Sequence, residues 1–161
     1  ILAAYDEPIP GGRVGLLVHE DDLSAVNWLA ASSELVAVAG MFPLAAYQKH
    51  DIEEKVIQFR SDCMRSLLPE KVEIFNCPET VAEWAHLQKL DVVIMAAPPV
   101  GIWDDLILDL ESSLAALGLV VIKRRHWWDA HFYPAAGAGF FKYKKLIPSA
   151  LDKLVDQASN L

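Results

Sequence analysis

The sequence predicts an α/β protein whose strands run mostly in parallel. Short apolar runs alternate along the chain with segments of helical periodicity, in the order βαβαβαβαβ. The expected strands, such as residues 14–19 and 91–96, are almost continuously apolar, which is typical of strands buried on both faces. Parallel neighbours need right-handed crossovers, so the helices are expected on both faces of one five-stranded sheet. We therefore expect a doubly wound, Rossmann-like fold.

The first elements follow a cluster of Pro and Gly residues at positions 8–12, so residues 1–12 are expected to be a lead-in or linker. Residues 13–161 are expected to form a single domain, because their number and their apolar share suit one core. A strand is expected over residues 14–19 and a helix over 24–31. A second strand is expected over residues 34–39, ending before Gly40 and Pro43.

The middle of the chain repeats this alternation. A stripe of apolar residues predicts a helix over residues 51–68, with Asp51, Glu53 and Glu54 in a first turn that favours acidic side chains. The remaining strands are expected at residues 71–75, 91–96 and 119–123, and the remaining helices at 78–90, 104–117 and 147–158. Gly118 is the expected cap of the helix before it. Residues 126–139 are expected to form an aromatic loop rich in Ala and Gly.

Composition limits the classes of function. The chain has 161 residues, 53% of them hydrophobic, and a formal net charge of −8, which repels nucleic acid from this domain taken alone. No apolar run reaches the roughly 18 residues of a membrane span. The two cysteines lack metal-site spacing and suit a reducing compartment. We expect a soluble protein of the cytoplasm or of an organelle stroma, that of a chloroplast included.

The turn after the first strand carries three consecutive carboxylates, Glu20, Asp21 and Asp22. In an open α/β sheet this turn borders the usual ligand site, where a dinucleotide fold places glycines. Carboxylates here would repel a phosphate. A Mg²⁺ site of the phosphoacceptor type would need an Asp at the end of a later strand, but residues 91–99 offer Ala96 and Ala97. The preferred interpretation is a solvated turn in which Asp22 or Ser24 caps the next helix; an unidentified polar ligand is the other.

Two further residue patterns bear on possible metal binding and catalysis. His126, Asp129 and His131 lie within six residues of one another and could in principle bind a transition metal, but no fourth ligand lies nearby in the sequence. No nucleophile elbow and no Ser/His/Asp spacing indicates a hydrolase. The sequence therefore names no catalytic residue and no metal ligand.

Three places in the chain resemble the N-terminal α/β domain of the photolyase/cryptochrome family. Asp22-Leu23 is similar to part of that family's opening motif, and the order of elements up to Asp91-Val-Val-Ile94 follows the family's order. The third place is Trp128-Asp129, followed by the segment from Phe132 to Lys144. The resemblance covers roughly residues 13–150.

The departures from that family bear on function. Glu20 and Ser24 stand where the family has two arginines, and Ala96–Gly101 stands where some members hold a pterin with an Asn and a Glu. The family's helical FAD-binding domain is absent from these residues. The resemblance therefore implies neither DNA repair nor flavin photochemistry by these residues. The leading hypothesis is a non-catalytic binding or assembly module whose partners are other domains or subunits of a larger assembly.

The five tryptophans of the chain favour this hypothesis, because Trp is enriched at interfaces. The alternative is an antenna-chromophore or small-ligand domain of a blue-light flavoprotein, with pterin, deazaflavin or FMN as cofactor if the family's function is retained. Its cleft would lie between the acidic turn and the loop at residues 96–101. The candidate cofactor-binding residues are His19, Asp21, Asp22, Ala97, Pro98 and Trp103. An enzyme is the third hypothesis, with Asp21, Asp22, Asp104, Asp129 and His131 as candidate residues.

Overall fold

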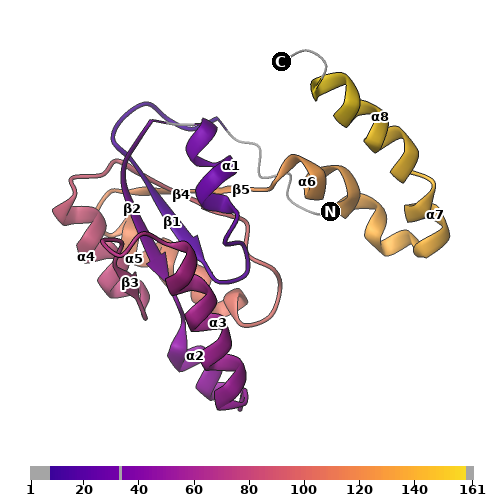
Figure 1. Ribbon diagram of the computed structural model, residues 1–161. Coiled ribbons are helices and arrows are strands. Elements are labelled where there is room, and N and C mark those ends of the chain that lie inside the picture. Colours follow the sequence, from indigo (N-terminus) through magenta and orange to yellow (C-terminus); the bar gives the residue numbers. More distant parts are fainter. Residues whose placement is uncertain (1–7, 33, 159–161) are drawn as a thin grey trace. The chain divides into compact units, whose positions relative to one another are not determined.

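The computed structural model describes residues 8–32 and 34–158 of the chain (Figure 1). Their contacts divide the chain into two compact units, a larger one that ends at Arg124 and a smaller one that begins at Arg125. The expected single domain over residues 13–161 stays a prediction, because two compact units can belong to one domain. The larger unit holds the sheet and is described first.

Five parallel strands form one sheet in the order β3-β2-β1-β4-β5. Their bounds are β1 Val14–His19, β2 Leu35–Met41, β3 Ile74–Phe75, β4 Val92–Ala96 and β5 Val120–Arg124. The central strand β1 pairs with β2 on one side and with β4 on the other. The chain therefore reverses its direction of travel across the sheet between β3 and β4. This arrangement confirms the expected doubly wound α/β fold and makes the carboxyl ends of β1 and β4 its switch point.

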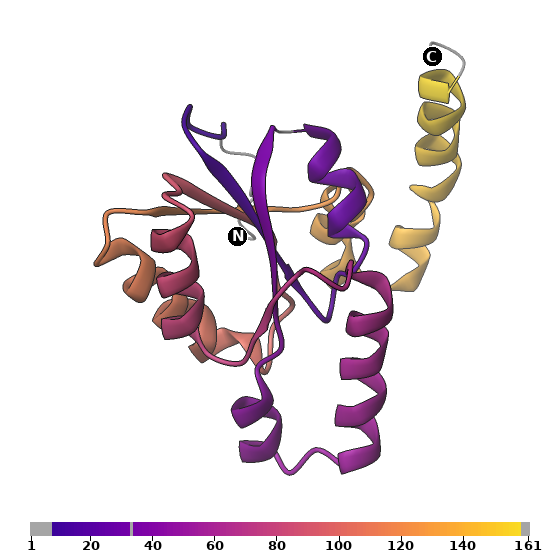
Figure 2. The same cartoon turned by 60° about the vertical axis from the view of Figure 1, so that its left-hand side comes forward.

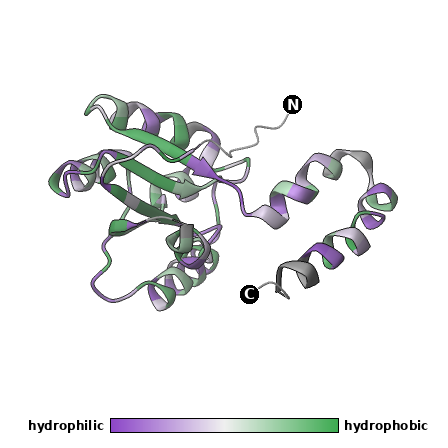
Figure 3. Cartoon of the chain, turned by 90° about the horizontal axis from the view of Figure 1, so that it is seen from above, coloured by the Kyte–Doolittle hydropathy of each residue, from purple (hydrophilic) through white to green (hydrophobic). Residues whose placement is uncertain are grey.

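Helices cover both faces of the sheet (Figure 2). One face carries α1 (Ala25–Trp28), α2 (Leu44–Lys49) and α3 (Glu54–Leu67). The other carries α4 (Pro78–Leu87) and α5 (Trp103–Ala115). Alternate residues of β1 enter the two cores: Leu16 packs with the first set, Leu17 with the second, and both are fully buried. The sheet is correspondingly hydrophobic in Figure 3.

Several expected boundaries in the larger unit are wrong. The expected helix over residues 24–31 is the short α1 followed by a 3-10 turn, Ala30–Ser32. The helix expected from residue 51 begins at Glu54, because Asp51 has a left-handed φ of 52° that a helix excludes. The strand expected over residues 71–75 is only Ile74–Phe75. The strand expected to end before Gly40 continues to Met41, and the helix α2, which is not among the expected elements, follows it with Pro43 at its N-cap position.

The smaller unit is helical. It comprises α6 (Trp127–Phe132), a 3-10 segment (Tyr133–Ala138), α7 (Phe140–Lys144) and α8 (Ile147–Ala158). The loop expected over residues 126–139 is therefore wrong, whereas the last helix is confirmed. Phe132 is buried, and its ring lies 4.7 Å from that of Trp128 and 5.0 Å from that of Tyr143. Such aromatic packing stabilises a helical segment that contains Pro134 and Gly137.

Within residues 8–32 and 34–158, no helix combines the length and the apolar character needed to cross a bilayer.

Candidate functional site

The switch point is built around His19, the last residue of β1. The His19 side chain is fully buried. The backbone amide of Asp21 donates to Nδ1 of His19 at 3.3 Å, and Nε2 lies 3.2 Å from the carbonyl oxygen of Ala96 at the end of β4. An amide can only donate and a carbonyl can only accept, so His19 is neutral with its proton on Nε2. The imidazole thus joins the ends of the two strands that meet at the switch point.

Glu20 is the next residue along the chain. Only 7% of its surface is exposed, which is rare for an acidic residue. Its Oε1 accepts a hydrogen bond from the hydroxyl of Tyr47 at 2.9 Å and another from the indole Nε1 of Trp103 at 3.2 Å. Its Oε2 is buried and has no hydrogen-bond partner among the described residues. Tyr47 comes from α2 and Trp103 from α5, so one carboxyl connects helices from both faces of the sheet.

Burial shifts the acid–base behaviour of these groups. It raises the pKa of Glu20, although the hydrogen bonds to its carboxyl act in the opposite direction. It lowers the pKa of His19 against the opposing effect of the Ala96 carbonyl, in agreement with the neutral tautomer. Burial and the nearby Glu20 carboxyl also raise the pKa of Tyr47, which stays a hydroxyl donor. The uncharged form is therefore favoured in each of these three groups.

The other two carboxylates of the turn have local partners. Asp21 forms an ion pair with Arg60 of α3. The Arg60 guanidinium also lies over the Tyr47 ring, 5.4 Å from its centroid. Asp22 accepts a hydrogen bond from the Ser24 hydroxyl at 2.6 Å. The Ser24 side chain makes no capping bond to α1, so the expected cap at this residue is wrong.

The structure places the sequence-predicted cleft residues in two groups. His19, Asp21 and Trp103 come together, with the His19 and Trp103 rings 5.1 Å apart. Ala97 instead donates its amide to the carbonyl of Arg124 at 2.6 Å, which extends the contact between β4 and β5. Pro98 follows in a half-buried part of the next loop. Asp22 is engaged with Ser24, as described above.

Sequence reasoning missed the central members of this cluster. The sequence predicts a solvated turn at Glu20 and gives no role to Tyr47 or Arg60. The available signal was that Glu20 directly follows six buried residues of β1. The enzyme candidates are also divided, because Asp129 and His131 belong to the smaller unit. Among the described residues, no group of three His, Cys, Asp or Glu side chains is arranged to hold a metal ion.

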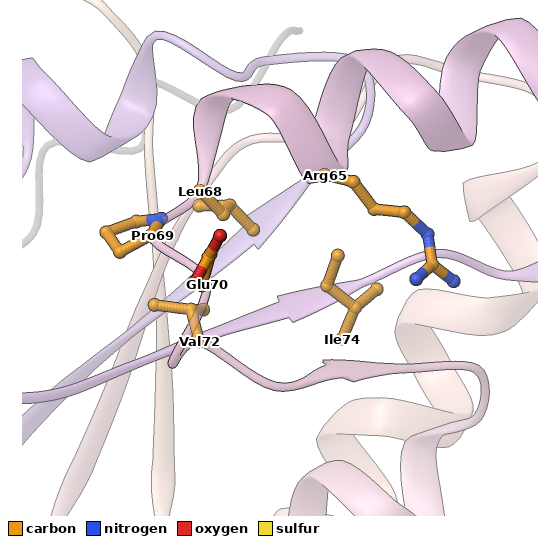
Figure 4. Close-up of a pocket in the computed structure, with 6 residues that line it drawn as sticks. All are labelled: Arg65, Leu68, Pro69, Glu70, Val72 and Ile74. Carbon is orange, nitrogen blue, oxygen red and sulfur yellow. The ribbon is translucent and has the colours of Figure 1, made fainter.

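A surface pocket of about 300 Å³ lies elsewhere on the larger unit (Figure 4). It is lined by Arg65, Leu68, Pro69, Glu70, Val72 and Ile74. These residues run from the end of α3 into the start of β3. The pocket therefore lies at the amino end of the sheet's shortest strand and not at the switch point.

Comparison with known proteins gives no relative. The chain matches no protein-family model, no curated protein and no solved structure.

The burial of neutral His19 predicts a pH effect on stability. Because the pKa of His19 is lowered on folding, its contribution is complete above the ordinary histidine value of about 6.5 and is lost as the pH falls through the lower, folded value. We expect this contribution to the free energy of unfolding to fall by up to about 1.4 kcal/mol per pH unit in that range. Urea unfolding between pH 5 and 7.5 measures it. His19→Gln should lose less stability than the wild type as the pH falls, and the control His86→Gln, at an exposed position of α4, should follow the wild type. Identical slopes in both variants would contradict this role of His19.

Proposed function

We propose that this chain is a photolyase/cryptochrome-like α/β domain that acts as a non-catalytic binding or assembly module. The observation that carries the proposal is the exposure of two adjacent phenylalanines of α7. Phe140 is 67% exposed and Phe141 80% exposed. Aromatic residues exposed together are characteristic of contact surfaces rather than of ordinary solvent-facing helices.

The chemistry around these rings indicates the kind of partner. Lys142 and Lys144 of the same helix and the adjacent Lys145 are exposed. We call Phe140, Phe141 and these three lysines the aromatic–basic surface. Residues 125–161 hold five basic and three acidic side chains, in a chain whose net charge is −8. The surface therefore contrasts in charge with the rest of the chain. It fits a protein partner that presents an apolar patch with an acidic rim.

The packing at the switch point supports a non-catalytic role. His19, Tyr47 and Trp103 are all at most 1% exposed, and they hydrogen-bond within the chain. These buried side chains lie at the switch point, where open α/β sheets usually bind their ligands. The turn also lacks the glycines with which a backbone surrounds a phosphate. A binding role carried by α7 needs no ligand at that position.

The test is the state of the protein in its native extract. We expect the wild type to elute in an assembly larger than a monomer and to cross-link to an acidic protein through α7. The variant Phe140→Asp/Phe141→Asp should elute as a monomer. Leu87→Asp, at a 77% exposed position of α4, is the matched control and should remain in the assembly. Raising the salt concentration should weaken the association, because the lysines contribute to it. A wild type found only as free monomer would overturn the proposal.

The alternative function is an antenna-chromophore or small-ligand domain. It rests on the resemblance to the photolyase/cryptochrome family, since the Trp103 and His19 rings at the switch point are themselves buried, 5.1 Å apart. Its test is independent of the binding experiment. The purified protein would show near-UV or blue absorbance after incubation with pterin, deazaflavin or FMN. If the protein shows no such absorbance with any of the three compounds, this alternative is excluded and the binding module is the remaining function.

A further inference from the structure

At the carboxyl end of β1, one carboxyl group has an oxygen that is buried without a hydrogen-bond partner among the described residues. Glu20 is 7% exposed, and both of its hydrogen bonds converge on Oε1. Its Oε2 is buried with no partner among the described residues. An ionised carboxylate with one bare buried oxygen is costly, whereas a carboxylic acid carries the proton on that oxygen and leaves the other as acceptor. Both donors bind Oε1, so neither of them compensates a charge at Oε2.

We propose that Glu20 is a proton-operated clamp. As a neutral acid it accepts hydrogen bonds from Tyr47 of α2 and Trp103 of α5 without a buried charge. Loss of its proton places a charge on a carboxyl whose Oε2 has no partner among the described residues, so the contact between these residues opens to let water solvate that oxygen. The device belongs to the larger unit and does not depend on the aromatic–basic surface.

The groups around Glu20 come from its own turn and from each helix packed against it. From its own turn, neutral His19 and the Asp21 carboxylate lie beside it. The Tyr47 hydroxyl comes from α2. The Arg60 guanidinium comes from α3 and is paired with Asp21, so the two charges compensate each other. From α5 comes the uncharged indole of Trp103. Burial of the carboxyl raises the pKa of Glu20 above its ordinary value.

The direction of the pH effect follows from this. Glu20 contributes its full stability below the ordinary glutamate value of about 4.3, and the contribution is lost as the pH rises through the folded value. The effect of His19 has the opposite sign, since it weakens the fold as the pH falls. A variant in which Glu20 no longer titrates is needed to separate its effect from that of His19.

Glu20→Gln is that variant, because an amide resembles the neutral acid in shape and keeps an acceptor for Tyr47 and Trp103. The unfolding constants of wild type and variant are measured in urea from pH 4 to 9. We expect their ratio, wild type over variant, to rise by up to about tenfold per pH unit and then to level off above the folded pKa. A ratio that stays constant or falls with pH would overturn the proposal, because Glu20 would then be ionised throughout.

A second measurement does not rely on the variant folding. In wild-type protein labelled with ¹³C at the glutamate carboxyls, the Glu20 signal should titrate at a higher pH than those of the exposed glutamates. The Trp103 indole proton should exchange with solvent faster above that pH, beyond the ordinary base-catalysed rise shown by the other tryptophans. The clamp would be contradicted if Glu20 titrated together with the exposed glutamates. It would also be contradicted if the exchange rate of the Trp103 indole proton did not change with the titration of Glu20.

Discussion

Replacing Trp103 with alanine is expected to lower the free energy of unfolding by about 3–5 kcal/mol. The Trp103 side chain is 1% exposed and belongs to the core between the sheet and α4 and α5. Its removal leaves a large cavity, ends the ring contact with His19 and removes one donor from Glu20. Urea denaturation at pH 7, followed by circular dichroism, measures the change.

The variant Trp103→Phe separates the loss of apolar packing from the loss of the hydrogen bond to Glu20. Phenylalanine keeps most of the apolar packing but cannot donate to Glu20, so a smaller loss of about 1–3 kcal/mol is expected. Trp127→Ala, at a 39% exposed position in the smaller unit, is the control and should change stability far less. A loss below about 1 kcal/mol for Trp103→Ala would show that the ring is not packed as described.

Replacing Leu16 with alanine is expected to cost about 2–5 kcal/mol. Leu16 lies in the middle of β1, is fully buried and packs between the sheet and the helices of the α1–α3 face. Strand β1 is paired on both sides, so its backbone cannot move easily to fill the space that the side chain leaves. The same denaturation experiment measures the effect.

The matched control is Leu87→Ala. It makes the same chemical change at the end of α4, where the side chain is 77% exposed. Its effect should stay within about 0.5 kcal/mol. Equal losses at the two positions would mean that the burial assigned to β1 does not exist in solution.

The fold could be predicted because its signals are local and repeated. The apolar runs of β1 and β4 are too long and too continuous for a sheet with a solvated face, and the crossover rule then limits the topology. The errors lie where tertiary contacts determine the secondary structure. Residues 127–138 are helical although Pro134 and Gly137 indicate a loop, because the alanines favour a helix and the buried ring of Phe132 supplies packing.

The candidate site was predicted only in part. His19, Asp21 and Trp103 were placed at the switch point because parallel strands bring their carboxyl ends together, and the structure brings these residues there. Glu20 was expected in solvent, because an acidic residue beside two others usually lies there. Its burial depends on Tyr47 and Trp103, which are 27 and 83 residues away in sequence. No local pattern reports contacts over such separations.

The two outer strands of the sheet bear on aggregation. An unpaired strand edge can recruit strands from other molecules and so start intermolecular sheets. Strand β3 offers only two residues at one edge, too few for a stable foreign ladder. At the other edge β5 ends in Lys123 and Arg124, and Lys123 is held by Glu111 of α5 at 2.5 Å. A short strand and a charged one therefore protect the sheet from self-templated polymerisation, a property that would matter at high concentration.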